Sequence, residues 1–175
     1  MRRAEKGRIM SSDPPMLHLL CGKIASGKST LAASLARGGG AVLIAEDAWL
    51  KALYSDQMSS IADYVRCAAT LRQVMGPHVV SLLNHGTSVV LDFQANTTEA
   101  RGWMRGILTR TNAAHQLHVL DVSDQTCLAR LHARNAAGDH PFAPTEEQFF
   151  QLSRYFTAPS EDEGFTIVRH GPDQA

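Results

Sequence analysis

Nine residues near the start of the chain constrain its fold more than any other feature. Residues 22–30 read GKIASGKST, which matches G-x-x-x-x-G-K-[ST] with Gly22, Gly27, Lys28 and Ser29 in the fixed positions. Glycines let a loop wrap so that its backbone N–H groups point at phosphate oxygens, and the helix that follows presents its positive end to the same anion. An apolar segment precedes the pattern and an alanine-rich amphipathic segment follows it. The pattern therefore predicts a strand, a phosphate-binding loop and a helix.

Within this loop the pattern suggests roles for single side chains. The predicted nucleotide-binding residues are Gly22, Lys23, Ile24, Ala25, Ser26, Gly27, Lys28, Ser29 and Thr30. Lys28 is expected to reach the β- and γ-phosphates, and the Ser29 hydroxyl is expected to bind Mg²⁺. No guanine-reading N-K-x-D sequence occurs, and nothing demands adenine, so the choice between ATP and GTP stays open. ATP with Mg²⁺ is the expected combination.

Apolar runs alternate with segments of helical period along the rest of the chain. Strands are predicted over residues 16–21, 41–45, 88–91, 117–122 and 165–168. Helices are predicted over residues 29–37, 47–53, 97–111, 123–137 and from 145 to about 157. Residues 61–85 carry apolar side chains every three to four positions, and Gly76-Pro77 predicts a break between two helices there. The alternation predicts an α/β fold: a three-layer α/β/α sandwich around a mainly parallel, roughly five-stranded sheet, with a short lid.

Chain length and composition are those of one globular domain. The 175 residues are 44% hydrophobic and 19% charged, which is too apolar for a disordered chain. Residues 1–15 hold charges, serines and a proline pair without periodicity, so we expect a flexible N-terminal tail before a single domain over residues 16–175. Cys21, Cys67 and Cys127 lie far apart, and an odd number cannot all pair within one chain. They are predicted to be reduced core residues.

The charge balance limits the classes of partner. Lys and Arg number 17, and Asp and Glu also number 17, so no net field would hold the chain on nucleic acid or on an anionic membrane. No apolar run approaches the roughly 18 residues of a membrane span, and the basic start leads into no apolar signal core. We expect a cytoplasmic protein, a monomer or a homodimer, that binds neither membranes nor nucleic acid.

Carboxylates follow or end two of the predicted strands, where a parallel sheet binds its ligands. Asp47 follows the second strand, and its carboxylate could take the proton of an acceptor hydroxyl. Glu46 is the second candidate for this base, and the alternative for Asp47 is a simple helix N-cap. Asp92 ends the third strand, where it could reach Mg²⁺ directly or through water, or could merely open the next turn.

Several arginines are further candidates. Arg130 and Arg134 lie four positions apart on one predicted helix, before the predicted flap 135–144, and could close over the transferring phosphoryl group. The alternative is a solvated helix face. Arg101 either faces the same pocket or is an ordinary solvated helix arginine.

Two more arginines, Arg66 and Arg72, lie on the helical lobe expected to wall the acceptor pocket. They could bind an anionic acceptor, and ordinary surface charge is the alternative.

With these residues in place, the chain from about Leu17 to His170 resembles the P-loop kinases that include polynucleotide 5′-hydroxyl kinases, zeta toxins and chloramphenicol phosphotransferase, with many uncharacterised bacterial ATP-binding proteins. The resemblance implies a base at Asp47 and lid arginines at Arg130 and Arg134. It also implies an acidic motif that ends in arginine, matched by the segment DFQANTTEAR, residues 92–101.

The chain departs from this group at one informative position. Many relatives carry an arginine three residues after the base, where this chain has Leu50. This departure counts against a phosphorylated nucleic-acid end as acceptor. Trp49 either contacts a flat or apolar acceptor or packs under the helical lobe.

The expected function is a Mg²⁺-dependent kinase that transfers the γ-phosphate of ATP to a hydroxyl of a small-molecule acceptor. Its predicted catalytic residues are Lys28, Asp47, Arg130 and Arg134, and its predicted metal ligands are Ser29 and Asp92. One alternative is a nucleic-acid 5′-hydroxyl kinase or a toxin-like sugar-nucleotide kinase. Another is a nucleotide-binding switch that yields no phosphorylated product.

Overall fold

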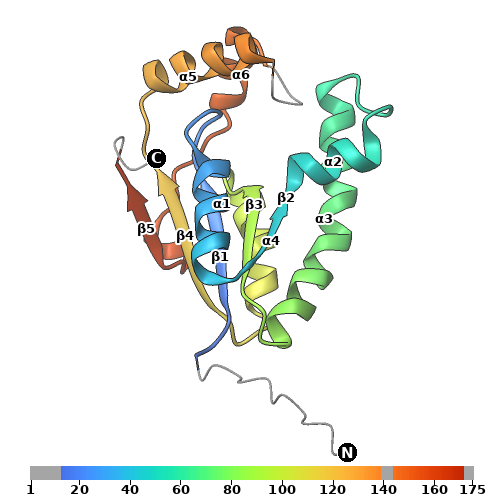
Figure 1. Ribbon diagram of the computed structural model, residues 1–175, viewed down its shortest axis with the longest axis vertical. Coiled ribbons are helices and arrows are strands. Elements are labelled where there is room, and N and C mark those ends of the chain that lie inside the picture. The colour runs from blue at the N-terminus through green and yellow to red at the C-terminus, as the bar shows by residue number, and fades with distance from the viewer. Residues whose placement is uncertain (1–12, 139–143, 172–175) are drawn as a thin grey trace, which may run out of the picture.

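A parallel sheet forms the centre of the computed structural model, which describes residues 13–138 and 144–171 (Figure 1). Its strands are β1 (Met16–Cys21), β2 (Val42–Ala45), β3 (Val89–Gln94), β4 (Ala114–Leu120) and β5 (Ile167–His170). They lie in the order β2-β3-β1-β4-β5, and every pairing is parallel. The predicted five-stranded parallel sheet is confirmed. The carboxyl ends of all five strands consequently meet at one edge, at the top of Figure 1.

Helices cover both faces of this sheet and its upper edge. They are α1 (Lys28–Gly39), α2 (Glu46–Tyr54), α3 (Ile61–Asn84), α4 (Thr98–Leu108), α5 (Asp124–Ala137) and α6 (Glu146–Ser153), with a short 3-10 helix η1 (Glu161–Glu163). In Figure 1, α1 covers one face, α3 and α4 lie towards the other, and α5 and α6 form a lid above the strand ends. This arrangement confirms the predicted α/β/α sandwich.

Alternate residues of each strand point to opposite faces of the sheet, so the core has one part on each face. Leu17 and Leu19 of β1 are fully buried and belong to the large hydrophobic cluster shared with α3 and α4. Leu20 points to the other face, where it packs with Ala32 of α1. Strand residues are buried on both faces because helices cover both, which explains the near-continuous apolar runs of the sequence. The three cysteines are free and buried, as predicted.

One predicted boundary is wrong. The sequence predicts a helix break at Gly76-Pro77, yet α3 runs unbroken from Ile61 to Asn84. A proline inside a helix removes one hydrogen bond and costs about 3 kcal/mol. Buried residues on either side of it, Met75 and Val79, pack into the same core cluster. Gly76 also lets α3 approach α4 closely, because a Cβ there would lie 3.3 Å from Trp103 Nε1. We infer that tertiary packing offsets the cost of the proline.

The remaining elements differ from prediction mainly at their ends. Ser123 caps α5 by accepting from the Thr126 amide, and Thr145 forms a capping box with Gln148 at α6. β3 continues to Gln94, and β5 begins at Ile167. Residues 1–12 of the predicted tail and residues 139–143 of the predicted flap lie outside the described residues.

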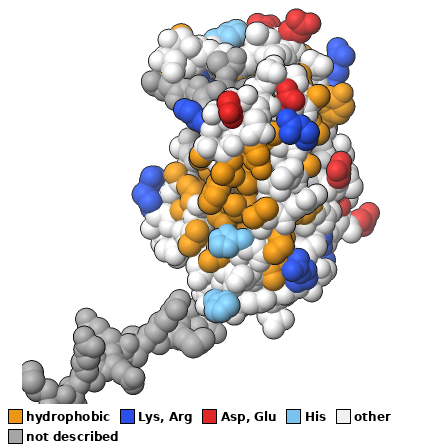
Figure 2. Space-filling view, turned by 90° about the vertical axis from the view of Figure 1, so that its right-hand side faces the viewer, with side chains coloured by type: hydrophobic (Ala, Val, Ile, Leu, Met, Phe, Trp, Pro, Cys, Tyr) orange, Lys and Arg blue, Asp and Glu red, His pale blue; other side chains and the backbone are white. Residues whose placement is uncertain are grey.

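Hydrophobic side chains gather on the side of the molecule formed by β2, α2 and α3, the face shown in Figure 2. Large exposed hydrophobic residues of β2 and α2 include Val42, Leu43, Trp49 and Leu53. β2 is an edge strand, so this side of the sheet is unpaired by any described strand. Within residues 13–138 and 144–171, no helix is both long and apolar enough to cross a membrane.

Candidate nucleotide and acceptor site

Asn96 holds the start of the loop between β1 and α1. The Gly22 amide donates to Asn96 Oδ1 over 2.9 Å, and Asn96 Nδ2 donates back to the Gly22 carbonyl over 2.9 Å. A Cβ at Gly22 would lie 2.6 Å from Ser26 Oγ and 3.2 Å from Leu120 Cβ. Only glycine therefore fits where the chain leaves β1. Further along, Ala25 and Gly27 have φ of 58° and 104°, which turns the loop sharply.

Lys28 lies across this loop at the start of α1. Its Nζ donates to the carbonyls of Gly22 and Lys23, each over 2.7 Å. Burial lowers the pKa of Lys28 to about 8, although the charge of Asp92 acts in the opposite direction. The ammonium group is thus directed at the inside of the loop, where a triphosphate would lie.

Several features suit the loop to an anion. Helix α1 begins at Lys28 with Gly27 as its N-cap, without a side-chain cap and without an acidic residue in its first turn. Its positive end is therefore available to a phosphate. Ser26 Oγ is buried and has no hydrogen-bond partner among the described residues. These features fit a nucleotide phosphate.

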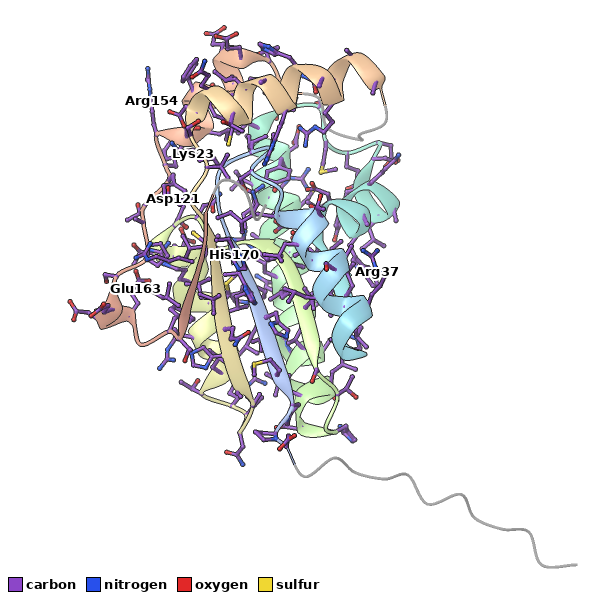
Figure 3. The ribbon with its side chains drawn as sticks, turned by 60° about the vertical axis from the view of Figure 1, so that its left-hand side comes forward. Lys23, Arg37, Asp121, Arg154, Glu163 and His170 are labelled. Atoms are coloured by element: carbon purple, nitrogen blue, oxygen red, sulfur yellow. The ribbon has the colours of Figure 1, made fainter. Side chains whose placement is uncertain are left out.

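The lid is fastened to this loop by two contacts. Lys23 pairs with Asp124 at the start of α5, and Figure 3 shows Lys23 directly beneath the lid helices. Arg130 Nη1 donates to the Ser26 carbonyl over 3.2 Å. A small cluster that includes Cys127, Leu131 and Phe149 packs α5 and α6 together, with Ile24 and Ala25 of the loop against it. Movement of the lid is thus coupled to the loop.

A cavity of about 890 Å³ opens between the loop, the lid and the helices α2 and α3. Residues from the loop and the lid that line it include Lys28, Ser29, Arg130, Arg134 and Gln148. The side opposite the loop, which we call the α2–α3 wall, consists of Glu46, Asp47, Leu50, Lys51, Ser55, Met58, Ser59, Ser60, Ile61 and Tyr64. Asp92 and Gln94 of β3 form the floor between them.

The pairing of β2 with β3 explains why the predicted carboxylates meet. Ala45 lies opposite Asp92 in the register, so Glu46 and Asp47 emerge beside Asp92. Asp92 lies inside β3, so the idea that it merely opens a turn is wrong. Burial raises the pKa of Asp92, while a hydrogen bond from Ser29 and the charge of Lys28 act to lower it. Ser29 and Asp92 together offer hard oxygen ligands, the type that Mg²⁺ prefers.

The two candidate bases have different surroundings. Asp47 is exposed to the cavity, and it is not an N-cap, because Ala45 occupies that position of α2. Glu46 is only 2% exposed, and its Oε1 lies 3.3 Å from Arg72 Nη2. Burial raises the pKa of Glu46, while Arg72 acts to lower it. Tyr64 packs behind this pair, and burial, followed by the charges of Glu46 and Asp47, raises the pKa of its hydroxyl well above the usual range.

Arg134 is the lid residue that faces Asp47. Its Nε is buried and lacks a hydrogen-bond partner among the described residues. Burial lowers the pKa of Arg134, and the charge of Asp47 acts to raise it. Arg130 and Arg134 both line the cavity, so the alternative of a solvated helix face is wrong for this pair.

Three other arginines serve elsewhere. Arg101 is fully buried and neither lines the cavity nor faces solvent, so both predictions for it are wrong. Arg66 is exposed and donates to Asp63 and to the Gln57 carbonyl, outside the cavity lining. Arg72 is held by Glu46 and lies 5.8 Å from the Trp103 ring.

Trp49 is 42% exposed and is not among the described residues that line the cavity. The structure therefore supports neither contact of Trp49 with an acceptor nor its packing under the helical lobe.

Sequence analysis missed several residues of the site. Asn96 lies inside the noted 92–101 segment, but only its two bonds to Gly22 reveal its role. Gln94, Tyr64 and the turn from Ser55 to Ile61 carry no motif, and their place in the cavity depends on how α3 packs. Among these missed residues, Asn96 is the one that the sequence could have indicated, because it follows the third predicted strand of a chain with a phosphate-binding loop.

Comparisons with known proteins agree with this fold. A family model described as an AAA domain matches residues 17–159. A candidate kinase from Chloroflexus aurantiacus J-10-fl superposes with a TM-score of 0.73 at 21% identity, over 94% of this chain and 91% of that one. A sugar kinase from Janibacter sp. HTCC2649 gives 0.63 at 18% identity, over 93% and 88%.

Mycobacterium tuberculosis APS kinase, solved with AMPPNP and APS, gives a TM-score of 0.62 at 20% identity, over 93% of this chain and 91% of that one. Among curated proteins, no sequence match is found. The structural likenesses confirm the predicted P-loop kinase fold, and identities near 20% carry no more than the fold.

Proposed function

Because the chain belongs to the AAA-domain family of P-loop proteins, we propose that it is a kinase that transfers the γ-phosphate of ATP to a hydroxyl of a small molecule. One observation carries this proposal: Lys28, Asp92, Asp47 and Arg134 line the same cavity from four different elements. A sugar kinase and an APS kinase share the fold, which supports the same class of reaction.

On the nucleotide side, the loop amides and Lys28 would hold the β- and γ-phosphates, and Ser29 and Asp92 would hold Mg²⁺. When bound, Mg²⁺ would neutralise charge on the phosphate oxygens. Lys28 Nζ donates to the carbonyls of Gly22 and Lys23, and both of these acceptors are neutral. A phosphate oxygen would be the stronger partner, because its negative charge adds a Coulomb attraction to the hydrogen bond from the ammonium group.

On the acceptor side, Asp47 would accept the proton of the acceptor hydroxyl. The acceptor oxygen forms a bond to the γ-phosphorus, the bond from that phosphorus to the β,γ-bridging oxygen breaks, and ADP leaves with the electron pair. The position of Asp47 supports this role, because it lies two residues after Ala45, the residue of β2 that pairs with Asp92. Glu46 is less suited, because Arg72 and the protein interior surround its carboxylate.

Arg134 would stabilise the charge that spreads over the transferring group. Its unpaired Nε is available for this purpose among the described contacts. An arginine in such a position contributes on the order of 10³–10⁵ in rate. Arg130 would hold the lid to the loop through Ser26 while the lid is closed.

A transfer assay with a matched pair of variants tests the proposal. The protein is incubated with Mg²⁺, γ-labelled ATP and a panel of sugars, polyols, nucleosides, their monophosphates and a 5′-hydroxyl oligonucleotide. We expect Asp47→Asn to lower the transfer rate by roughly 10²–10⁴-fold, because general-base catalysis contributes that much. The affinity for ATP should stay within about threefold of wild type. Asp162→Asn, on the exposed η1 helix, is the control and should match wild type.

Two other outcomes would redirect the assignment. Product on the oligonucleotide alone would point to a nucleic-acid end kinase. No product from any compound, together with ATP turnover that Asp47→Asn leaves unchanged, would overturn the kinase and leave a nucleotide-driven switch.

A further inference from the structure

The charges of the α2–α3 wall differ from those of the rest of the cavity. The loop and lid contribute three cations, Lys28, Arg130 and Arg134, on the side assigned to the triphosphate. The wall contributes two carboxylates, Glu46 and Asp47, and among its described residues a single cation, the exposed Lys51. An acceptor that carried its own phosphate, sulfate or carboxylate would therefore meet like charge on this wall.

Arg72 offsets the charge of Glu46, so the like charge that an anionic acceptor would meet on this wall comes mainly from Asp47. The guanidinium of Arg72 lies behind the wall, 3.3 Å from Glu46 Oε1, and is absent from the described lining of the cavity. The opposite side of the guanidinium lies over the Trp103 ring. The positive charge of Arg72 therefore pairs with Glu46 and does not face a ligand in the cavity.

Glu46 itself offers a vacant hydrogen-bonding position. Oε1 is buried, and although Arg72 lies within ion-pair distance, no donor makes a hydrogen bond to this atom among the described residues. Glu46 also lines the cavity. A carboxylate only accepts hydrogen bonds, so the group that satisfies Oε1 must be a donor such as a hydroxyl. Buried polar atoms without partners are rare and mark places where a ligand group fits.

The rest of the wall is amphipathic. Leu50 is only 2% exposed, and Met58 and Ile61 add apolar surface beside the hydroxyls of Ser59, Ser60 and Tyr64. Ser59 and Ser60 both donate to Asp63, which fixes the turn that carries them. Such a surface suits a compound with one apolar face and several hydroxyl groups.

We propose that the acceptor is an uncharged polyhydroxy compound, which gives one hydroxyl to Asp47 for transfer and donates a second hydroxyl to Glu46. This inference rests on the proposed kinase function and adds the class of acceptor. It assigns Glu46 and Arg72 to selection of the acceptor and excludes acceptors that already carry a phosphate, sulfate or carboxylate.

Matched pairs of acceptors test this class directly. Glucose is compared with gluconate and glucose 6-phosphate, and adenosine with AMP, by kcat/KM for transfer and by calorimetric binding in the presence of AMPPNP and Mg²⁺. We expect each neutral compound that binds to be preferred over its anionic partner by at least about tenfold. Glu46→Gln should reduce that preference several-fold while ATP affinity is retained, because the positive charge of Arg72 then lacks its counter-charge.

Lys51→Ala covers the case in which Glu46→Gln fails to fold, because Lys51 is exposed. In this variant kcat/KM for each neutral acceptor should fall at least as much as for its anionic partner, whereas a site built for an anion would lose about tenfold more for the anionic partner, together with its cation. Faster transfer to the anionic partners, with a loss in Lys51→Ala, would overturn this inference and leave the kinase intact. No transfer to any compound, with ATP binding retained, would instead overturn the proposed kinase and this inference with it.

Discussion

Two arginines, Arg101 and Arg134, differ in how their guanidinium groups are hydrogen-bonded. Arg101 donates to Glu163 through Nε and Nη2 over 2.6 and 2.9 Å, and to the carbonyls of Ala95 and Thr157 over 3.0 and 2.8 Å. Arg134 has a buried Nε without such a partner in the described chain. The guanidinium of Arg101 thus joins the end of β3 to the segment before β5, whereas that of Arg134 faces the cavity.

Replacement of Arg101 should destabilise the fold strongly. Arg101→Ala leaves the Glu163 carboxylate and two carbonyls without their donor, and the loss of one partner of a buried ion pair costs about 3–5 kcal/mol. We expect the free energy of unfolding, measured with urea, to fall by that amount. ATP affinity of the protein that remains folded should be unchanged, because Arg101 does not line the cavity.

Arg105 on the same helix provides the control. It is half-buried, donates once to the Gly164 carbonyl over 3.0 Å and lies 5.5 Å from the Phe165 ring. Arg105→Ala should cost about 1 kcal/mol, the usual value of one such hydrogen bond. If the two variants lose equal stability, the structural role assigned to Arg101 is wrong.

At the scale of elements, the sequence predicts what local pattern determines and misses what contacts between distant segments determine. The phosphate loop, all five strands and the caps at Ser123 and Thr145 follow from local pattern. Asp47 and Asp92 follow from the rule that parallel strands end at one edge. The unbroken α3 and the burial of Arg101 do not, because each depends on packing with residues remote in the sequence.

Strand register also creates a row of three histidines across β1, β4 and β5. His18 Nδ1 lies 3.0 Å from His118 Nε2, and His118 Nδ1 lies 2.9 Å from His170 Nε2. Figure 3 labels His170 on β5, the strand at one edge of the sheet. Burial, followed by the charges of His18 and His170, lowers the pKa of His118 to about 4. Each link needs one protonated and one free nitrogen, so the row suits neutral rings.

This row should make the fold sensitive to acid. The unfolded chain binds a proton at His118 near pH 6.5 and the folded chain only near pH 4, so the stabilisation is complete above pH 6.5 and is lost as pH falls towards 4. Urea unfolding at pH 7 and pH 4.5 should show that His118→Gln loses about 2 kcal/mol less than wild type over this interval. His78→Gln, at an exposed position of α3, should behave as wild type. Equal losses in all three proteins would contradict the assignment.

In the whole molecule, the cavity lies where the loop, the lid and the α2–α3 wall meet, and each of these three parts is held by its own contacts. The loop rests on the sheet and is tied to Asn96, the lid has its own small hydrophobic cluster, and the α2–α3 wall belongs to the large core. The lid contacts the loop through Lys23 and Arg130. The unpaired Arg134 Nε and Glu46 Oε1 lie on opposite sides of this meeting point.

Binding of Mg²⁺-ATP by calorimetry at pH 7 and pH 9, with wild type, Lys28→Ala and Lys28→Arg, tests the central claim most directly. Because the pKa of Lys28 is about 8, the charged form falls from most of the population at pH 7 to a small minority at pH 9. We expect Kd to rise about tenfold from pH 7 to pH 9 in wild type and to change little over this range in Lys28→Arg. Lys28→Ala should bind at least about 100-fold more weakly than wild type at pH 7. Wild-type affinity in Lys28→Ala would contradict the claim that this loop and its lysine hold the phosphates.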